Sequence, residues 1–471
     1  MGAFWARLSG KPLSEAENLE RGLGLIEATS LNVTFMVGIG PFIVIPLVAQ
    51  TLAGPQSLLA WLVGALLALM DGCVWAELGA AMPQAGGSYV FLREEYGPAK
   101  WGRMMSFLYI WQTLFQGPLS VASGAIGFAG YSTYLVAKSS WLVGILRPLG
   151  SYADSAIAAG IVVVVVALLY RRIATVGKIS VVLCAVVIGT ILWLIYGGAT
   201  HFNASLLSTA PGSWNLSWIF LAALGHASVH AVYSYLGYYN VCNLGAEMKQ
   251  PERNIPAAIF LSVIGVGILY LALQTMILGV VPWQQAASAK AVVSLFVERV
   301  YGPGWASAAT WLILLTAFGS IFSATLGYSR IPYAAALDGN FFSVFARVHP
   351  AKRFPHISLL ALGASAVLCC MVLSLGEVIR AILAMRCLIQ FVAQGLGLML
   401  LHSRGKAQRW PFRMWFYPLP VLIAMAGWLA IFASTGRAPI LASLAAAAAG
   451  VLVYLARARY SRQWPFQEVL R

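Results

Sequence analysis

The chain has 471 residues, of which 60% are hydrophobic and only 10% are charged, and its mean hydropathy is +0.80. A soluble protein of this size needs more charged residues than this to cover its surface. The composition therefore excludes a soluble globular domain and predicts a polytopic membrane protein. The formal net charge of +15 does not indicate nucleic-acid binding, because the basic residues lie in short loops between apolar runs.

Basic side chains gather in the loops that follow alternate apolar runs. If the runs cross the bilayer in alternate directions, these loops all lie on one side, and the positive-inside rule predicts that this side is cytoplasmic and holds the amino terminus. An even number of runs places the carboxyl terminus there too. The basic residues of these loops are Arg93, Lys100, Arg103, Arg171, Arg172, Lys178, Arg347, Lys352, Arg353, Arg404, Lys406, Arg409 and Arg413.

Residues 1–21 are polar and of mixed charge, without a basic start that leads into a short apolar core, so we expect no cleaved signal peptide. The six cysteines lie inside apolar runs without metal-ligand spacing, and we interpret them as small core residues. The sequence therefore predicts a multi-pass protein of the inner or plasma membrane, embedded in the lipid bilayer with both termini in the cytoplasm.

The first apolar run, residues 25–50, is long enough to cross a bilayer but is interrupted by Met-Val-Gly-Ile-Gly-Pro-Phe at residues 36–42. Pro41 lacks an N–H, and Gly38 and Gly40 leave the backbone free to depart from helical angles. Unpaired backbone groups cost several kcal/mol in hydrocarbon, so such a break is buried in protein or lines a wet cavity. Freed amides can bind an anionic group and freed carbonyls a cationic one. The alternative is a simple kink that a neighbouring helix heals.

Length and hydropathy together give about twelve apolar runs, all of which we expect to be transmembrane helices. The runs are residues 25–50, 58–80, 101–136, 153–170, 179–196, 218–245, 257–281, 305–337, 357–375, 378–402, 415–434 and 439–456.

The sixth run contains a second interruption, Ser-Tyr-Leu-Gly-Tyr-Tyr-Asn at residues 234–240. It stands in the first run of a second group of five, as the earlier break stands in the first run of the first group. Paired interruptions of this kind indicate an inverted-repeat transporter whose site lies between the broken helices. The predicted organisation is a cytoplasmic segment at 1–24, a first repeat at 25–197, an extracytoplasmic loop at 198–214, a second repeat at 215–402, two further helices within 403–456 and a cytoplasmic tail at 457–471.

Several polar residues inside the runs are weaker candidates. An acid at the depth of Asp71 costs about 2.5–3.5 kcal/mol on insertion scales, so it is either functional or a satisfied contact between helices. Gln112 and Gln116, one turn apart, either face a transport path or make interhelical amide contacts. His226 and His230 are also one turn apart, but the stretch lacks the glutamate of a zinc motif and a clear third ligand, so we expect no metal.

Four stretches of the chain form a set of motifs. The first is WAELGAAMPQAGGSYV at residues 75–90, followed by EYGP at 95–98. The others are GAEMKQPERNIP at 245–256, SRIPYA at 329–334 with Asp338-Gly339, and Val348-His349-Pro350. Together they closely resemble the amino acid–polyamine–organocation superfamily of permeases. In that family the second stretch is similar to the segment after the sixth helix, the third to the end of the eighth helix, and the fourth to the loop beyond. Amphipathic loops alone would not produce these motifs jointly and in the order of the family.

The resemblance implies a fold of two inverted five-helix repeats with broken first and sixth helices, two additional helices and alternating access. It also implies a substrate held between the breaks, with its carboxylate on free amides at the start of a half-helix and its ammonium on carbonyls. Pro41 cannot donate to such a carboxylate. The substrate-binding positions carried over are Val37, Gly38, Ile39, Gly40 and Phe42 of the first break and Tyr235, Leu236, Gly237 and Tyr238 of the sixth.

Further positions are gating or coupling candidates. Glu77 and Arg253, from the matching motifs, are expected to serve cytoplasmic closure. Hydroxyls such as Ser320 or Ser323 would help first-helix carbonyls to coordinate a co-transported sodium ion. Asp71 and Gln112 complete this group.

Departures from the family pattern bear on the cargo and on its driving ion. The Gly-Pro form of the first break is closer to the polyamine-uptake branch, but that branch commonly places an acid after an aromatic residue in the sixth break, where this chain has Tyr238-Tyr239. A polyamine without nearby carboxylates would leave charge uncompensated. A lysine common in the fifth helix of the family falls on Val187, so proton coupling through that residue is not expected. Sodium coupling, proton coupling by another group and exchange without an ion stay open.

These observations predict a secondary transporter, not an enzyme and without a cofactor, that moves a neutral amino acid by alternating access. One alternative keeps the class and changes the cargo to a polyamine or another organic cation. Two others change the class, to an intramembrane metalloenzyme that uses His226 and His230 or to a receptor that binds without transport.

Overall fold

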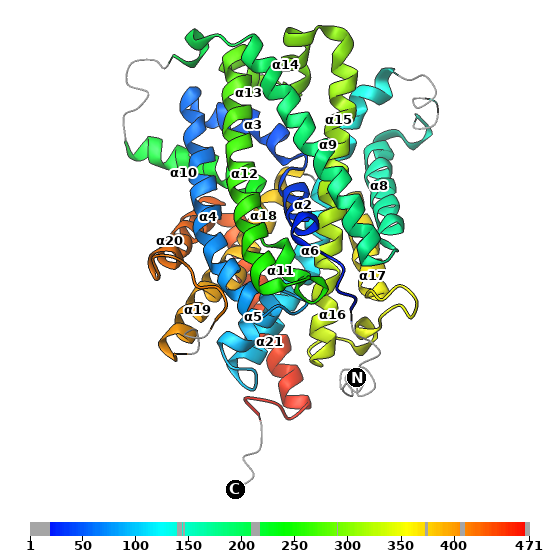
Figure 1. Cartoon of the computed structure of the whole chain (residues 1–471), viewed down its shortest axis with the longest axis vertical. Helices are drawn as coiled ribbons and strands as arrows, with labels where there is room; N and C mark the ends of the chain where they lie inside the picture. Colours follow the sequence, from blue (N-terminus) through cyan, green and yellow to red (C-terminus); the bar gives the residue numbers. More distant parts are fainter. Residues whose placement is uncertain are drawn as a thin grey trace.

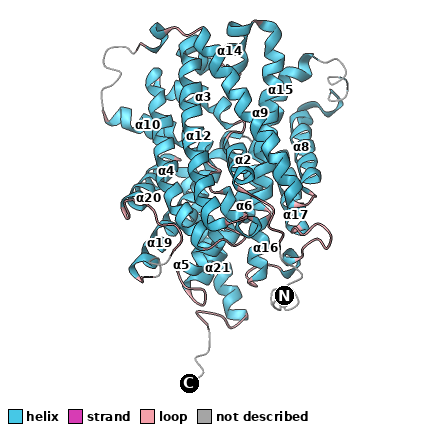
Figure 2. Cartoon of the chain, viewed as in Figure 1, coloured by secondary structure: helices cyan, strands magenta, loops and turns pink. Residues whose placement is uncertain are grey.

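The computed structural model describes residues 19–138, 144, 147–208, 217–289, 291–372, 375–405 and 410–466. Over these ranges the chain is a bundle of helices, and its only strand-like pairings are two isolated bridges (Figure 2). The expected all-helical fold is confirmed. The expected terminal segments and the loop at 198–214 lie partly outside the described residues.

The helices are α2 (Leu25–Met36), α3 (Gly40–Leu52), α4 (Leu58–Ala81), α5 (Ser88–Glu95), α6 (Trp101–Lys138), α8 (Ala153–Leu169), α9 (Ile173–Thr200), α10 (Trp218–Tyr235), α11 (Asn240–Asn243), α12 (Pro251–Val280), α13 (Trp283–Ser288), α14 (Val292–Tyr301), α15 (Ala306–Tyr328), α16 (Arg330–Leu337), α17 (His356–Val372), α18 (Leu375–Arg386), a π-helix (Cys387–Ala393), α19 (Gln394–Ser403), α20 (Leu419–Ser434) and α21 (Arg437–Tyr460). The bundle is shown in Figure 1.

Within the described ranges, seven helices are long and apolar enough to cross a bilayer, and the pair α2 and α3 forms an eighth span that is bent by 43°. α17 and α20 are shorter apolar helices. α6 and α10 are helical over two more of the expected runs. The total of twelve spans stays a prediction.

The first expected break falls where the glycines and proline stand. α2 ends at Met36, and α3 begins at Gly40 with Pro41 in its first turn, where the missing N–H of a proline leaves no backbone bond unmade. A single transmembrane run thus becomes two half-helices.

The sixth run is broken in the same way between α10 and the single turn α11. The chain leaves helical geometry after Tyr235, and Gly237 has a φ of 128°, which side-chain-bearing residues rarely adopt. The ring of Phe35 would lie 2.8 Å from a Cβ at position 237. A glycine therefore lets the second break approach the first closely.

Helices that correspond in the two predicted repeats pack on each other. α4 packs against α12, α6 against α15, and α8 against α17. α8 and α17 lie on one flank of the molecule and α4, α10 and α20 on the other, with α2 between them (Figure 1). This pairing supports the two-repeat organisation. The repeats and their residue boundaries stay a prediction.

The end of the molecule that carries α5 and α16, at the bottom of Figure 1, is here called the α5 end. The first described residues and the end of α21 lie there too. Arg330 forms a two-bond ion pair with Glu247, at 2.9 Å from Nε and 2.8 Å from Nη2, and both side chains are buried. Arg93 pairs with Asp338. These contacts hold α5, α16 and the segment after α11 together.

Candidate functional site

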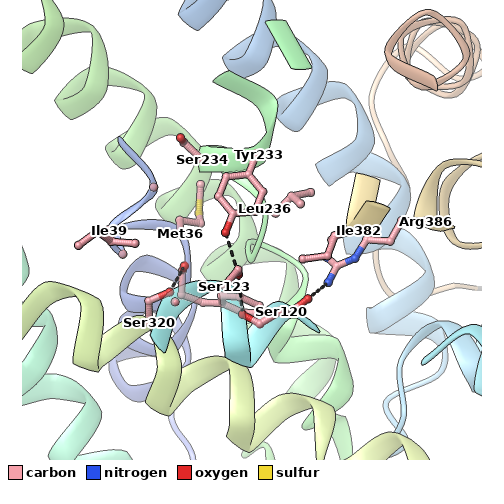
Figure 3. A pocket seen from close by; sticks show the side chains of 14 residues that line it. Met36, Ile39, Ser120, Ser123, Tyr233, Ser234, Leu236, Ser320, Ile382 and Arg386 are labelled. Carbon is pink, nitrogen blue, oxygen red and sulfur yellow. Dashed lines mark hydrogen bonds between the residues drawn. The ribbon is translucent and has the colours of Figure 1, made fainter. Parts of the chain in front are cut away.

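A small cavity lies between the two breaks (Figure 3). Its volume is about 40 Å³, which is room for only a few waters. The cavity is lined by Phe35, Met36, Gly38, Ile39, Gly40, Ser120, Ser123, Gly124, Tyr233, Ser234, Leu236, Ser320, Ile382 and Arg386.

The start of α3 has free amides beside this cavity, which Ile39 and Gly40 line. The backbone N–H groups of Ile39, Gly40 and Phe42 have no backbone partner in the described part of the chain. They stand at the amino end of a helix, where the helix dipole favours a negative charge. This is the arrangement that the resemblance implied for a substrate carboxylate.

The end of α2 is held by hydroxyl groups from two other helices. Ser320 of α15 donates to the carbonyl of Phe35 at 3.0 Å. Tyr270 of α12 lies 2.7 Å from the carbonyl oxygen of Met36 and 3.1 Å from that of Ser234, so one hydroxyl serves both breaks. Because the freed carbonyls find partners inside the protein, the breaks are stable at this depth.

Asn32 of α2 supports the sixth break in return. Its amide nitrogen donates to the carbonyl of Tyr238 at 2.6 Å, and its amide oxygen accepts from the N–H of Val241 at 3.0 Å. The side chain is fully buried. The two broken helices are therefore joined through Asn32 as well as through Tyr270.

Tyr238 points away from the cavity. Its hydroxyl donates to Asp71 of α4, which also accepts from the indole N–H of Trp75 at 2.9 Å. Asp71 is 2% exposed and does not line the cavity. The structure thus brings the acid of the second run to the back of the sixth break.

Arg386, at the end of α18, is a cavity residue that the sequence analysis missed. It is 1% exposed, and it donates to Ser120 Oγ at 2.6 Å and to the hydroxyls of Tyr239 and Tyr328. Its Nε is buried without a hydrogen-bond partner. The rule that singled out Asp71, a charge inside an apolar run, would have found it, since it lies within residues 378–402.

The other predicted binding positions divide into two groups. Gly38, Ile39, Gly40 and Leu236 line the cavity. The remaining residues are buried beside the breaks without lining it, and they are Val37, Phe42, Tyr235, Gly237 and Tyr238. The ring of Tyr235 packs against Trp61 and Tyr270 instead.

Of the gating and coupling candidates, Ser320 alone joins the cavity-lining set. Ser323 shares a 2.5 Å hydrogen bond with Thr34, where α15 meets α2. Gln112 lines a separate small cavity between α6, α18 and α21. Arg253 is exposed near the start of α12.

Glu77 is buried near the α5 end, away from the cavity. One of its oxygens lies 2.7 Å from His402 Nε2, and the other accepts from the N–H of Met414 at 3.0 Å. Glu77 therefore joins α4 to α19 and to the segment before α20. Around His226 and His230, the described residues bring together no group of three or more side chains able to hold a metal.

Comparison with known proteins places this geometry in a family. The Amino acid permease family model matches residues 23–461. The chain is 27% identical over 395 residues to the human cationic amino acid transporter 4, a match that covers 79% of this chain and 58% of the relative.

Two bacterial relatives from Bacillus subtilis match over nearly their whole lengths. The serine/threonine exchanger SteT is 25% identical, with 90% of this chain and 92% of the relative covered. The methylthioribose transporter is 23% identical, with 95% of each chain covered. These relatives are transporters, and the family model matches nearly the whole chain. With its two broken helices meeting at one cavity, the chain belongs to the amino acid permease family.

Proposed function

We propose that this protein carries an amino acid across a membrane by alternating access, with the zwitterionic head group of the substrate held between the two breaks. The observation that supports this most directly is the cavity where the free amides of α3 meet the sixth break. Binding sites at the midplane between discontinuous helices are the arrangement that transporters of this architecture use.

The cavity lining argues against a cationic cargo. No acidic residue is among the residues that line it, and Asp71, at the back of the sixth break, is engaged by Tyr238 and Trp75. A polyamine would therefore leave its charge uncompensated. A neutral amino acid, or one whose side chain is anionic, fits the lining better. The relatives carry the names of different cargoes, so the family alone does not choose among them.

The contacts at the α5 end support a conformation that is closed on that side. The Arg330–Glu247 and Arg93–Asp338 pairs join the parts that would separate if the site opened there. The positive-inside distribution of the loops supports a cytoplasmic position for this end, in the cell membrane.

Two groups of side chains support ion coupling. Oxygens of Thr34, Ser320 and Ser323 gather where α15 meets the end of α2, as a sodium ion would require. Asp71 offers a carboxylate for a proton. The test measures uptake into vesicles with a sodium gradient or a pH gradient imposed alone. Uptake driven by one gradient identifies the coupling ion, and uptake driven by neither indicates uncoupled exchange.

The first test is a thermal-shift screen of the purified protein against the common amino acids, putrescine and spermidine, because a ligand of the folded state raises apparent stability. Stabilisation by amino acids supports the proposal, and stabilisation by polyamines alone contradicts it. Counterflow of the stabilising amino acid into sealed vesicles then distinguishes a transporter from a receptor that only binds. Stoichiometric zinc, lost when His226 or His230 is changed, would favour the metalloenzyme.

A further inference from the structure

We propose that Arg386 forms a second anion-binding subsite, which takes a carboxylate on the side chain of the substrate, so that the preferred cargo is an acidic amino acid. This inference rests on the proposed function, since it assigns the side-chain end of the same site.

Among the described residues, no acidic side chain forms an ion pair with the buried charge of Arg386. Each hydrogen bond recorded for Arg386 goes to a neutral hydroxyl. The ring of Tyr328 lies 5.4 Å from its guanidinium carbon, a cation–π contact that attracts the charge but does not neutralise it. Burying an unpaired cation is unfavourable, and an anion that reaches it from the cavity offsets that cost.

The guanidinium also has donor capacity left for a ligand. Its Nε has no hydrogen-bond partner, and the buried hydroxyl of Ser234 on the same cavity wall has none either. The side chain of Arg386 extends from α18 toward Ser120 at the edge of the cavity (Figure 3). A carboxylate entering the cavity would find a charged donor and a neutral donor there, both unused by the protein.

The cavity therefore has two places for negative charge. One is the set of free amides at the start of α3, where Gly40 lines the wall, and the other is the guanidinium of Arg386 on α18. A neutral amino acid has one carboxylate and fills only the first place. An acidic amino acid has two, and its second carboxylate matches the charge that the protein leaves unpaired.

The experiment measures Kd values of the purified protein for L-aspartate, L-glutamate, L-serine and L-leucine, and the uptake of the same four by proteoliposomes. It compares the unmodified protein with Arg386→Met and Arg386→Lys. Arg380→Met serves as the control, because Arg380 is an exposed arginine of the same helix. Arg386→Met removes three hydrogen bonds, so this variant could fail to fold. In that case the binding preference of the unmodified protein and the result for Arg386→Lys still decide the test.

We expect the unmodified protein to prefer an acidic amino acid. Arg386→Met should weaken acidic binding by about 10- to 100-fold and leave neutral binding within about threefold, the Lys variant should fall between, and Arg380→Met should change neither. If neutral amino acids bind and acidic ones do not, or if Arg386→Met weakens both classes equally, the second subsite is wrong while amino acid transport stands. Binding of no amino acid of either class would overturn the proposed function and the subsite together.

Discussion

Gly38 and Gly40 stand two positions apart in the first break but have different structural roles. A Cβ at position 38 would lie 2.5 Å from the Cβ of Ser320, a distance that real side chains do not adopt. A Cβ at position 40 would meet Ser234 Oγ at 3.4 Å and the ring of Tyr233 at 3.5 Å, which needs at most a small adjustment. Gly38 is therefore required for packing, and Gly40 keeps the wall of the cavity open.

Gly40→Val should abolish amino acid binding while the ligand-free protein keeps nearly its normal melting temperature, because the added methyl groups occupy a cavity of only about 40 Å³. Thermal shift with and without ligand measures both quantities. Gly38→Ala is the matched control and should lower the melting temperature itself. Unchanged uptake by Gly40→Val would remove the first break from the binding site.

Tyr238→Phe should lower the stability of the protein by about 1.5–3 kcal/mol, because it removes one of the donors to the buried carboxylate of Asp71. Substrate affinity should change much less, since Tyr238 does not line the cavity. Denaturant unfolding in detergent and ligand binding give the two values. A loss of affinity with unchanged stability would instead place Tyr238 in contact with the substrate.

At the residue scale, the sequence indicates some of the site and misses the rest for a physical reason. A break made of Gly38, Gly40 and Pro41 is a local property of the backbone, so it can be read from seven consecutive residues. The direction of a side chain depends on its neighbours in space. Tyr238 is predicted to contact substrate, yet the structure turns it toward Asp71, and Arg386 stands 346 positions beyond Gly40 in the chain.

At the scale of the helices, the two broken spans depend on α12, which the sequence analysis treats as an ordinary apolar run. The hydroxyl of Tyr270 reaches a carbonyl of each break. The sequence around residue 270 gives no signal that Tyr270 binds the two breaks, because its partners at Met36 and Ser234 come close only when the bundle has formed. Sequence locates the breaks, and tertiary packing supplies the groups that stabilise them.

Tyr270→Phe should destabilise the protein by about 1–3 kcal/mol and slow transport, because it leaves buried carbonyls of both breaks without this donor. The measurement combines denaturant unfolding with initial uptake rates. Tyr301→Phe is a suitable control, since the Tyr301 hydroxyl also donates to a backbone carbonyl, that of Trp193. This hydrogen bond is only partly buried, and Tyr301 does not line the cavity. Equal effects of the two changes would argue against a special role for α12.

At the scale of the whole molecule, closure at the α5 end involves residues from both predicted repeats. Arg93 of α5 pairs with Asp338 just after α16, and both side chains are partly exposed. Arg330 and Glu247 form a second pair, which is buried. The family motifs contain Glu247, Arg330 and Asp338, and Arg93 lies between the motif stretches 75–90 and 95–98. Sequence resemblance therefore indicates this end of the molecule, although it does not indicate which residues pair.

Arg93→Asp and Asp338→Arg, each alone, should favour the conformation that is open at the α5 end, and the double exchange should restore closure. The reporter is the labelling rate of a cysteine placed at Ser123 in the cavity, with a thiol reagent applied from the α5 side. The same protein without the added cysteine gives the background from the native thiols. Labelling that fails to return toward the original rate in the double variant would contradict a direct pair.

The π-helix at Cys387–Ala393 follows Arg386 directly and joins α18 to α19. A π-helical turn contains one residue more than an α-helical turn, and each residue of an α-helix turns the chain by about 100°. Deleting one residue from this segment would keep Arg386 in the sequence but rotate α18 relative to α19. The position of the Arg386 charge relative to α19 therefore depends on the number of residues in this segment. If Arg386 binds substrate as proposed, we expect a one-residue deletion there to change substrate selectivity although every cavity-lining side chain is kept.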